Sequence, residues 1–570
     1  MVDQLDGGEA LLDSWRSIGI DYVFCASGSE WASVWEALAR QKRDATPGPV
    51  YMDLWHETVA VGMAIGYTLV TRRIQAVLLH AGAGLLQGSM AINGALLACV
   101  PMLVFSSEGV TFGERPGVDP GSQWYRNLSV VGGTRSLIAP TVKWSHEAAS
   151  VETLYESVLR TAEIAQHAPA GPAYLGIPVE TLLAPWQPPR HRRSLPPQGR
   201  KISPQEEIAA ATAMILEADN PIIITETAGR DPRATHALTT FCDLLAIPVI
   251  EPLSSVCGNF PRRHPLHLGG GNPQLLAQSD LVILINTRSP WYPPSSKPVQ
   301  AQTLVLDEAP QRPYMAYQVL HADRYLEGEV AHSLAAITAH AADLGFDKSA
   351  IESRRARHAA THATLAQKIT ETEMRVRESS LNDGLIDPAL LAASLRELTT
   401  QDSIFVDETI THSQVLQQHL QLDAPGRYYY VQGGLGQGIA VALGVKLAAR
   451  DKLVVLTLGD GSFIYNPLVA SFAASRDQSL PILVVIFNNR KYLSMKQNLL
   501  RSYPGGLAAQ LDPMPGVSLD TQPELSAFVA PFGMLGLSVT RSDQLASALQ
   551  RAIESVAAGT TAVINVMLSR

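Results

Sequence analysis

Residues 453–458 read LVVLTL and are followed at once by Gly459-Asp460-Gly461-Ser462. A second apolar run, PILVVIF at 481–487, is followed by Asn488-Asn489-Arg490-Lys491-Tyr492. Both runs are short, rich in β-branched residues and bounded by turn formers, which predicts two strands buried on both faces. The segment 466–479 between them is predicted to be a helix. A strand, helix and strand of this length form a parallel crossover, and ligands of such sheets bind beyond the carboxyl ends of the strands.

This arrangement is expected to bring Asp460 and Asn489 to the same edge of the sheet. Mg²⁺ prefers oxygen ligands, and proteins commonly bind it through one or two carboxylates together with phosphates of a substrate or cofactor. The Asp460 carboxylate and the Asn489 side-chain oxygen are candidate ligands, and the backbone carbonyl of Lys491 is a third. The sequence therefore predicts a site for Mg²⁺ and a diphosphate. The alternative is an ordinary strand-end turn in which Asp460 only caps the next helix.

The Gly-Asp-Gly and Asn-Asn pattern resembles the thiamine-diphosphate signature of the superfamily that contains acetolactate synthase, benzoylformate decarboxylase and pyruvate decarboxylase. The resemblance implies thiamine diphosphate and Mg²⁺ as cofactors, with the metal held by Asp460, Asn489 and Lys491. The residues that it implies at the cofactor are Glu57, Thr411, Gly434, Leu435, Gly459, Asp460, Gly461, Ser462, Asn489, Lys491 and Tyr492. Leu435 matches the bulky apolar residue beneath the bent cofactor, and simple core packing is its alternative role.

Residues 50–72 read VYMDLWHETVAVGMAIGYTLVTR, which predicts a strand and then a helix of small residues that begins near Glu57. In the superfamily that the chain resembles, a glutamate at this place bonds the aminopyrimidine ring and promotes loss of the thiazolium C2 proton. A carboxylate shielded from water suits that task, because the thiazolium is a weak carbon acid. The alternative is that Glu57 is an ordinary first-turn acid favoured by the helix dipole.

Two predicted strand-end loops, FCASGSE at 24–30 and LHAGAG at 79–84, resemble the loops that carry a serine and a histidine in benzoylformate decarboxylase. Ser29 and His80 are therefore the candidate catalytic residues beside Glu57. A serine can orient a carboxylate, and an imidazole can carry protons near neutral pH. Each has a plainer role open to it, as a turn former or as a structural histidine.

The second histidine of benzoylformate decarboxylase has no counterpart in this chain. His412, just after Thr411, could substitute for it, and local hydrogen bonding near the diphosphate is its alternative role. Gln123 lies where acetolactate synthases carry an active-site glutamine.

The composition is that of a globular enzyme: 46% of the 570 residues are apolar and 17% are charged. The net charge of −9 and the pI near 5.9 argue against a nucleic-acid partner. The four cysteines lie far apart with no CxxC pair, which predicts neither a zinc site nor a disulfide framework. Neither a signal-peptide pattern nor a membrane-spanning run is present, so we expect a cytoplasmic protein without a membrane partner.

Two polar stretches suggest the domain organisation. Residues 185–201 are rich in Pro and Arg and predict an extended linker, and residues 343–380 predict a surface helix. The expected fold class is α/β, with three doubly wound parallel-sheet domains. Their expected bounds are 1–185 for an N-terminal pyrimidine-binding domain, 200–345 for a central Rossmann-like domain and 375–570 for a C-terminal diphosphate- and Mg²⁺-binding domain.

The central domain is expected to contain strands at 221–225, 247–250, 281–285 and 303–306. It has no GxGxxG after its first strand. The resemblance allows FAD or ADP in such a domain, as in acetolactate synthase or oxalyl-CoA decarboxylase. Residues 286–292 read NTRSPWY where acetolactate synthases carry Arg-Phe-Asp-Asp-Arg, so FAD is not expected.

The resemblance implies an enzyme, a thiamine-diphosphate-dependent lyase or transferase that cleaves or forms a C–C bond next to a carbonyl. Decarboxylation of a 2-oxo acid, with or without carboligation, is the main expectation. The alternative is a 2-hydroxyacyl-CoA lyase or an oxalyl-CoA decarboxylase-like activity, for which basic residues of 490–501 could contact CoA phosphates or simply form a solvated face. A regulatory paralogue without catalysis is disfavoured, because Glu57, Asp460 and Asn489 are all present. The resemblance also implies a homodimer or homotetramer with active sites shared between chains.

Overall fold

The computed structural model describes residues 4–109, 132–252, 255–312, 319 and 321–569. The chain divides into two compact units. Unit 1 comprises Met1–Gly199, Val431–Asp451 and Tyr465–Leu480, and unit 2 comprises Arg200–Tyr430, Lys452–Ile464 and Pro481–Arg570. Among the described residues, every helix is too short or too polar to cross a membrane.

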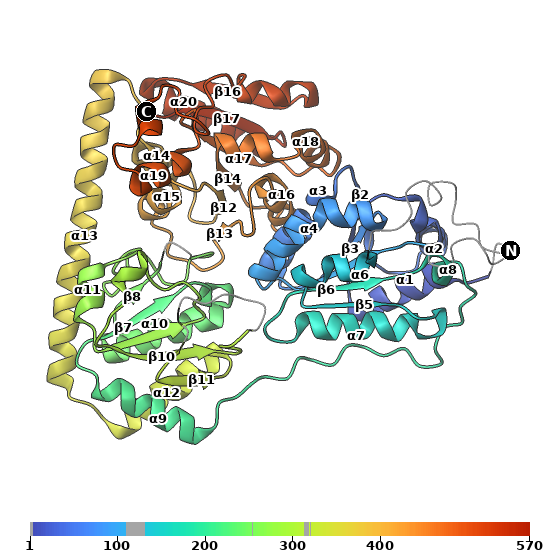
Figure 1. Cartoon of the computed structure of the whole chain (residues 1–570), viewed down its shortest axis with the longest axis horizontal. Coiled ribbons are helices and arrows are strands. Elements are labelled where there is room, and N and C mark those ends of the chain that lie inside the picture. Colours follow the sequence, from blue (N-terminus) through green and yellow to red (C-terminus); the bar gives the residue numbers. More distant parts are fainter. Residues whose placement is uncertain (1–3, 110–131, 253–254, 313–318, 320, 570) are drawn as a thin grey trace. The chain divides into compact units, whose positions relative to one another are not determined.

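Unit 1 is built on a six-stranded parallel sheet of order β2-β1-β3-β4-β6-β5 (Figure 1). Its strands are β1 (Tyr22–Ala26), β2 (Val50–Leu54), β3 (Gln75–Leu79), β4 (Met102–Ser106), β5 (Trp144–Glu147) and β6 (Pro172–Gly176). Its main helices are α1 (Gly7–Ile18), α2 (Ala32–Arg43), α3 (Glu57–Thr71), α4 (Ala81–Leu97), α7 (Leu154–Gln166), α16 (Gly438–Ala448) and α18 (Leu468–Asp477). The predicted helix start at Glu57 is confirmed.

Unit 2 contains two further parallel sheets, of order β11-β10-β9-β7-β8 and β13-β12-β14-β15-β17-β16. The first is formed by β7 (Pro221–Thr225), β8 (Val249–Ile250), β9 (Leu281–Ile285), β10 (Gln302–Asp307) and β11 (Arg324–Glu327). The second is formed by β12 (Ile404–Glu408), β13 (Tyr428–Tyr430), β14 (Val454–Gly459), β15 (Leu483–Asn488), β16 (Leu535–Val539) and β17 (Ala562–Met567). The helices of unit 2 include α9 (Gln205–Glu217), α10 (Pro232–Leu245), α11 (Pro273–Gln278), α12 (Val330–Leu344), α13 (Lys348–Asp383), α14 (Pro388–Leu398), α15 (Ser413–Leu420), α17 (Asp460–Tyr465), α19 (Leu493–Ser502) and α20 (Ser542–Ala557).

The three parallel sheets confirm the expected α/β fold class. The apolar runs at 453–458 and 481–487 form β14 and β15, which pair in parallel with Gly459 opposite Phe487. The helix between them is shorter than expected, because α17 already begins at Asp460 and α18 starts only at Leu468. In the sheet of β7 to β11, the predicted strand at 247–250 is reduced to β8, and β11 was not predicted.

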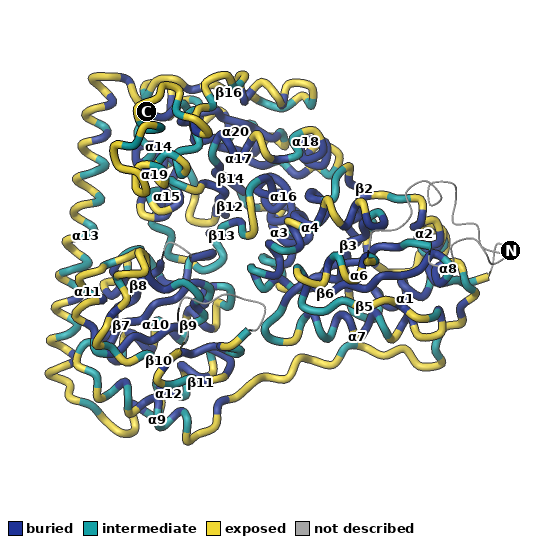
Figure 2. Tube along the Cα trace, viewed as in Figure 1, coloured by how far each residue is buried: buried dark blue, intermediate teal, exposed yellow. Residues whose placement is uncertain are grey.

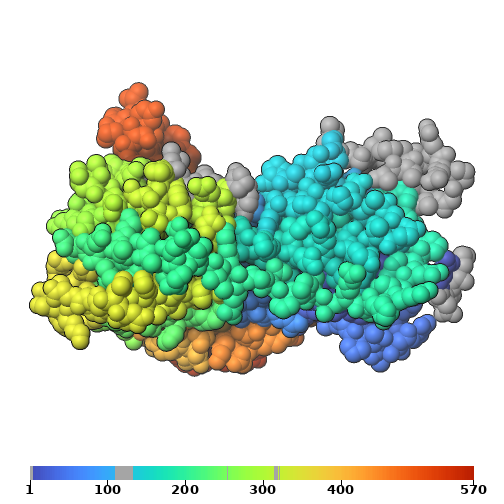
Figure 3. All heavy atoms as spheres, turned by 90° about the horizontal axis from the view of Figure 1, so that it is seen from below, coloured from blue at the N-terminus to red at the C-terminus, as the bar shows by residue number. Residues whose placement is uncertain are grey.

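Burial follows the strands and leaves the connecting polar segments in solvent (Figure 2). All residues of β3, β4, β7, β9, β12 and β15 are buried. By contrast, α13 is exposed along most of its length, and 187–200 is an extended segment on the surface that Figure 3 shows. Apolar runs without alternation predict such strands well, because a parallel sheet is covered on both faces.

Within unit 1, α3 and α16 pack closely enough that their glycines touch backbone. A Cβ on Gly66 would lie 2.0 Å from the carbonyl oxygen of Val441, and one on Gly444 would lie 2.1 Å from the carbonyl oxygen of Met63. A side chain at either position would force the helices apart, at a cost that is typically about 1 to 3 kcal/mol for overpacking in a core. This close approach explains the small-residue sequence of α3 and fixes the helix that begins with Glu57.

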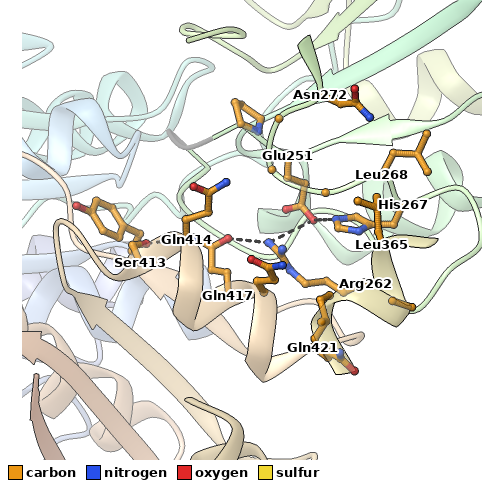
Figure 4. A pocket seen from close by; sticks show the side chains of 18 of the residues that line it. Glu251, Arg262, His267, Leu268, Asn272, Leu365, Ser413, Gln414, Gln417 and Gln421 are labelled. Atoms are coloured by element: carbon orange, nitrogen blue, oxygen red, sulfur yellow. Dashed lines mark hydrogen bonds and ion pairs between the residues drawn. The ribbon is translucent and has the colours of Figure 1, made fainter. Parts of the chain in front are cut away.

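Unit 2 encloses a cavity of about 600 Å³, lined by residues after β8 and by parts of α13 and α15 (Figure 4). A buried ionic cluster forms one wall. Glu251 Oε1 lies 3.3 Å from His267 Nε2 and 3.6 Å from Arg262 Nη2, and Arg262 Nη2 also donates to Gln417 Oε1 at 2.6 Å. Burial alone would raise the pKa of Glu251, but Arg262, His267 and the Asn259 N–H outweigh it and hold the pKa at about 2. The cluster therefore keeps a charged carboxylate inside the protein.

Removing the guanidinium should leave this carboxylate buried without a counter-charge. We expect Arg262→Met to destabilise the protein by about 3 kcal/mol at pH 7, the range seen when one partner of a buried ion pair is removed. The Glu251 pKa is depressed from 4.5 to about 2, so its stabilising contribution is present above pH 4.5 and is lost as the pH falls toward 2. The difference in the free energy of unfolding between variant and wild type, measured by urea unfolding, should therefore become smaller as the pH falls from 4.5 toward 2.

Arg263→Met is the matched control. The Arg263 guanidinium lies 3.5 Å from Asp423, and its side chain is 53% exposed. Exposed ion pairs contribute little, so this variant should unfold almost as the wild type does. An Arg262→Met protein as stable as the Arg263→Met protein at pH 7 would show that Arg262 does not stabilise the buried Glu251 carboxylate.

Candidate functional site

The order of the sheet in unit 1 predicts where a ligand binds. The chain leaves β1 toward β2 on one side and later returns through β3 on the other, so the two connections separate between β1 and β3. Ligands of open parallel sheets bind at such a switch point, beyond the carboxyl ends of the strands. Glu30 follows β1 and His80 follows β3 directly, which brings both residues to this crevice.

A carboxylate and an imidazole meet there. The two carboxylate oxygens of Glu30 lie 3.0 and 2.9 Å from His80 Nδ1, and Glu30 Oε1 also accepts a hydrogen bond from the Ala81 N–H at 3.0 Å. The Glu30 side chain is fully buried, whereas 34% of the His80 side chain is exposed. The hydrogen bond to Glu30 outweighs burial and raises the pKa of His80, and the charges of Glu57 and Glu108 act in the same direction.

Glu57 lies at the same end of α4. It is the first residue of α3, and His56 caps this helix by accepting a hydrogen bond from the Thr58 N–H at 3.1 Å. A Cβ added to Gly84 would lie 3.0 Å from Glu57 Oε1, so the first turn of α4 runs close beside this half-buried carboxylate. A third carboxylate, that of Glu108, accepts from the Gly82 N–H at 2.9 Å.

Two of these residues, Glu30 and Glu108, were not predicted from the sequence. Ser29 was predicted to face the substrate, and in the structure it is exposed and makes no hydrogen bond to the described residues. The neighbouring Glu30 contacts His80. The available signal was a carboxylate within a few residues of the end of a buried strand. Glu108 follows β4 in the same way. Gln123 lies outside the described residues.

The glycine loop 433–436 also belongs to unit 1. Gly433 and Gly436 have φ angles of +91° and +90°, which side-chain-bearing residues rarely adopt. A Cβ on Gly433 would lie 2.5 Å from the Cα of Gly94, and one on Gly434 would lie 2.9 Å from Met90 Sδ. The loop is therefore pressed against α4, and the half-buried Leu435 is held at its centre rather than in the core.

In the sheet of β12 to β17 in unit 2, the chain connections separate between β12 and β14. The predicted metal residues lie near this point, with Asp460 directly after β14 and Asn489 directly after the adjacent strand β15. Asp460 is 3% exposed and Asn489 is 7% exposed. Asn489 Oδ1 accepts from the Lys491 N–H at 3.0 Å. Burial raises the pKa of Asp460 to about 6, although the N–H groups of Gly461, Arg490 and Lys491 lower it. The structure thus brings the two predicted segments together around the Asp460 carboxylate.

Further predicted residues belong to the same unit as Asp460. A Cβ on Gly461 would lie 2.5 Å from the ring of Tyr492, so only glycine fits beneath that ring. Ser462 Oγ donates to the Glu408 carbonyl at 3.0 Å. Thr411 is half-buried on the cavity wall, and the adjacent His412 has Nε2 3.4 Å from Asn489 Nδ2. Burial lowers the pKa of His412.

These residues fit a divalent cation that carries a diphosphate. Asp460 Oδ2 is buried and has no hydrogen-bond partner among the described residues. A buried acceptor of this kind is costly unless a cation or donor completes it. The described part of the chain has no group of three or more His, Cys, Asp or Glu side chains that could hold a metal. One carboxylate, one amide and one backbone carbonyl suit Mg²⁺, which keeps phosphate or water oxygens for its other positions.

The five-stranded sheet of unit 2 uses its crevice differently. Its connections separate between β7 and β9, and Glu226 follows β7 there. The Glu226 side chain accepts hydrogen bonds from the backbone N–H groups of Arg288 and Ser289 after β9. Backbone N–H groups of this kind can bind anions, and here a carboxylate of the protein itself accepts their hydrogen bonds.

Comparison with known proteins gives matches along most of the chain. Residues 5–113 match the thiamine pyrophosphate enzyme N-terminal TPP binding domain, 208–321 the central domain and 409–566 the C-terminal TPP binding domain. Benzoylformate decarboxylase of Pseudomonas aeruginosa is 24% identical over 87% of this chain and 88% of its own length. The acetolactate synthase large subunit of Haemophilus influenzae is 24% identical over 96% of this chain and 92% of its own.

The crystal structure of benzoylformate decarboxylase from Polynucleobacter necessarius has the same fold, with a TM-score of 0.77, 20% identity and coverage of 99% of this chain and 98% of that one. The order of the three matched domains along the sequence is the order of the three parallel sheets. With both TPP binding domains and the central domain matched, the chain belongs to the thiamine pyrophosphate enzyme family.

Proposed function

We propose that this protein is a thiamine-diphosphate- and Mg²⁺-dependent 2-oxo acid decarboxylase, with or without carboligation to a second carbonyl compound. The observation that carries the proposal is the His80 side chain, backed by the Glu30 carboxylate at 2.9 Å, at the end of α4 where Glu57 also lies. Decarboxylation needs a proton donor to complete it. An imidazole that can be charged near neutral pH is suited to that step.

Each residue would have a separate task. When bound, thiamine diphosphate supplies a carbon nucleophile and an electron sink. Glu57 would bond the aminopyrimidine, and the loop that contains Gly434 and Leu435 would hold the cofactor bent. His80 would exchange a proton with the substrate through Nε2, the ring nitrogen that Glu30 leaves free.

The metal would be held by Asp460, Asn489 and the Lys491 carbonyl, with Gly459 to Ser462 and Tyr492 around the diphosphate. This assignment rests on the buried, unpartnered Asp460 Oδ2. FAD is not part of the proposal, because Glu226 already occupies the N–H groups of Arg288 and Ser289 in the crevice of the five-stranded sheet.

A homodimer or homotetramer is proposed as the working form, with each active site formed by Glu57 of one chain and Asp460 of another. Large apolar side chains near Glu57 are exposed in the single chain: Trp55 is 61% exposed, Leu86 52% and Met90 36%. Exposed apolar surface of this kind is typical of protein interfaces. A cofactor with a ring at one end and a diphosphate at the other also suits two facing crevices.

Asp460→Ala tests the metal site. The variant loses the charged ligand, so thiamine diphosphate with Mg²⁺ should no longer bind at micromolar concentrations, measured by calorimetry. The matched control is Asp477→Ala at the exposed end of α18, which should bind as the wild type does. Equal affinity in Asp460→Ala and wild type would refute the assignment.

Glu57→Gln tests the reaction. The amide keeps the shape of the side chain but not its basicity, so cofactor binding should persist while exchange of the C2 proton, followed by NMR, slows by about 10²- to 10⁴-fold. Wild type and variant should then be screened with pyruvate, benzoylformate and hydroxyacyl-CoA compounds. Release of CO₂ from a 2-oxo acid by the wild type alone is the expected outcome; cleavage of only the acyl-CoA compounds would replace the proposed activity by a lyase.

A mixing experiment tests the shared site. Glu57→Gln and Asp460→Ala chains are each expected to be inactive, but a heterodimer of the two would carry one site with both native residues and one with neither. Co-expression with two affinity tags should therefore restore activity in the doubly tagged fraction. Purified heterodimers without activity, or a fully active monomer on sizing, would exclude the arrangement.

A further inference from the structure

The buried Glu30 carboxylate was not predicted from the sequence motifs, and the proposed function gives it no task of its own beyond its contact with His80. We propose that Glu30 is a positioning residue for catalysis, which acts through His80 by fixing its ring orientation and making Nε2 the atom that gives and takes the proton. This inference rests on the proposed decarboxylase function and adds a residue to it.

The contacts of Glu30 dictate the tautomer of His80. A carboxylate can only accept hydrogen bonds, so the ring nitrogen that faces it must carry a hydrogen. Both Glu30 oxygens lie within 3.0 Å of Nδ1, which assigns the hydrogen to Nδ1. The other nitrogen, Nε2, has no hydrogen-bond partner among the described residues, and the side chain as a whole is 34% exposed.

The surroundings of the pair are built for this contact. A Cβ on Gly28 would lie 2.3 Å from both Glu30 Oε2 and His80 Nδ1, so glycine at this position lets the two side chains meet. Glu30 also accepts the N–H of Ala81, whose φ of +41° is rarely adopted by residues with a side chain. The same carboxylate therefore holds the ring of His80 and the strained backbone that follows it.

The charges that act on His80 all favour the imidazolium. Glu30 after β1, Glu57 at the start of α3 and Glu108 after β4 are the acidic groups that raise its pKa, with Glu30 the strongest. In the proton transfer, the Nε2–H bond breaks, the proton passes to the substrate-derived carbon and Nε2 keeps the electron pair. The neutral ring then regains a proton from solvent, so the cycle needs no other reagent.

The experiment separates this role from simple capping of α4. Glu30→Gln keeps an oxygen that can accept from Nδ1 and from Ala81 but removes the charge. Protein labelled with ¹³C at histidine Cε1 would be titrated without cofactor or substrate, and the His80 signal identified by its loss in His80→Gln. An ion pair at this distance typically shifts a pKa by about 1 to 3 units, so the His80 pKa should fall by that amount in Glu30→Gln.

Glu108→Gln is the matched comparison, because Glu108 accepts from the next N–H of α4 and raises the His80 pKa less than Glu30 does. Its effect on the His80 titration should be clearly smaller. Glu30→Asp retains the charge and should restore most of the wild-type pKa. In the active enzyme, the alkaline limb of kcat should move to lower pH in Glu30→Gln by the same shift that NMR measures.

An unchanged His80 titration in a folded Glu30→Gln protein would overturn the proposal, whatever the substrate proves to be. If Glu30→Gln does not fold, Gly28→Ala provides the test, since its Cβ should part the two side chains and lower the His80 pKa while Glu30 remains. A shifted titration in a protein that decarboxylates no 2-oxo acid would instead refute the proposed function and leave the pair intact.

Discussion

Burial of both faces of a parallel sheet is the constraint on which the rest of this structure depends. Strands such as β14 and β15 contain almost no polar side chain until their last residue, because each face is covered by helices. Polar chemistry is therefore confined to the carboxyl edge, where side chains can accept hydrogen bonds from the backbone N–H groups of the following turns. Glu30, His80, Asp460 and Asn489 all lie within a few residues of such strand ends.

The same constraint explains what the sequence could predict. Uninterrupted apolar runs identified the central strands within about two residues, the boundary error expected of such patterns. The residues after β14 and β15 could be predicted as partners because two strands joined by one crossover must end at the same edge. Glu57 could be placed at a helix start because the helix that follows it consists of small residues, which the tight packing of Gly66 on Val441 requires.

What could not be predicted depends on contacts between residues far apart in the sequence. His80 and Glu30 are separated by two crossovers, and Glu108 by a third. Which side chain of the 24–30 loop faces His80 is set by the short 3₁₀ turn η1 (Ser29–Trp31), which buries Glu30 and exposes Ser29. A difference of one position in a turn is beyond what hydrophobic periodicity can resolve. The brief strand β8 likewise carries too few residues to give a periodic signal.

The six-stranded sheet of unit 1 and the five-stranded sheet of unit 2 each have a buried glutamate near the switch point, and the two glutamates have different roles. Glu226 follows β7 as Glu30 closely follows β1, and each carboxylate reaches across to the strand beyond the switch point. Glu226 accepts hydrogen bonds from backbone N–H groups, which cannot titrate. Its role in the crevice is therefore structural. Glu30 contacts an imidazole whose side chain is 34% exposed, so the charge of Glu30 acts on a ring that can titrate. The difference between a structural and a functional carboxylate at the same place in the fold is thus the partner it meets: an N–H that cannot titrate, or a ring that can.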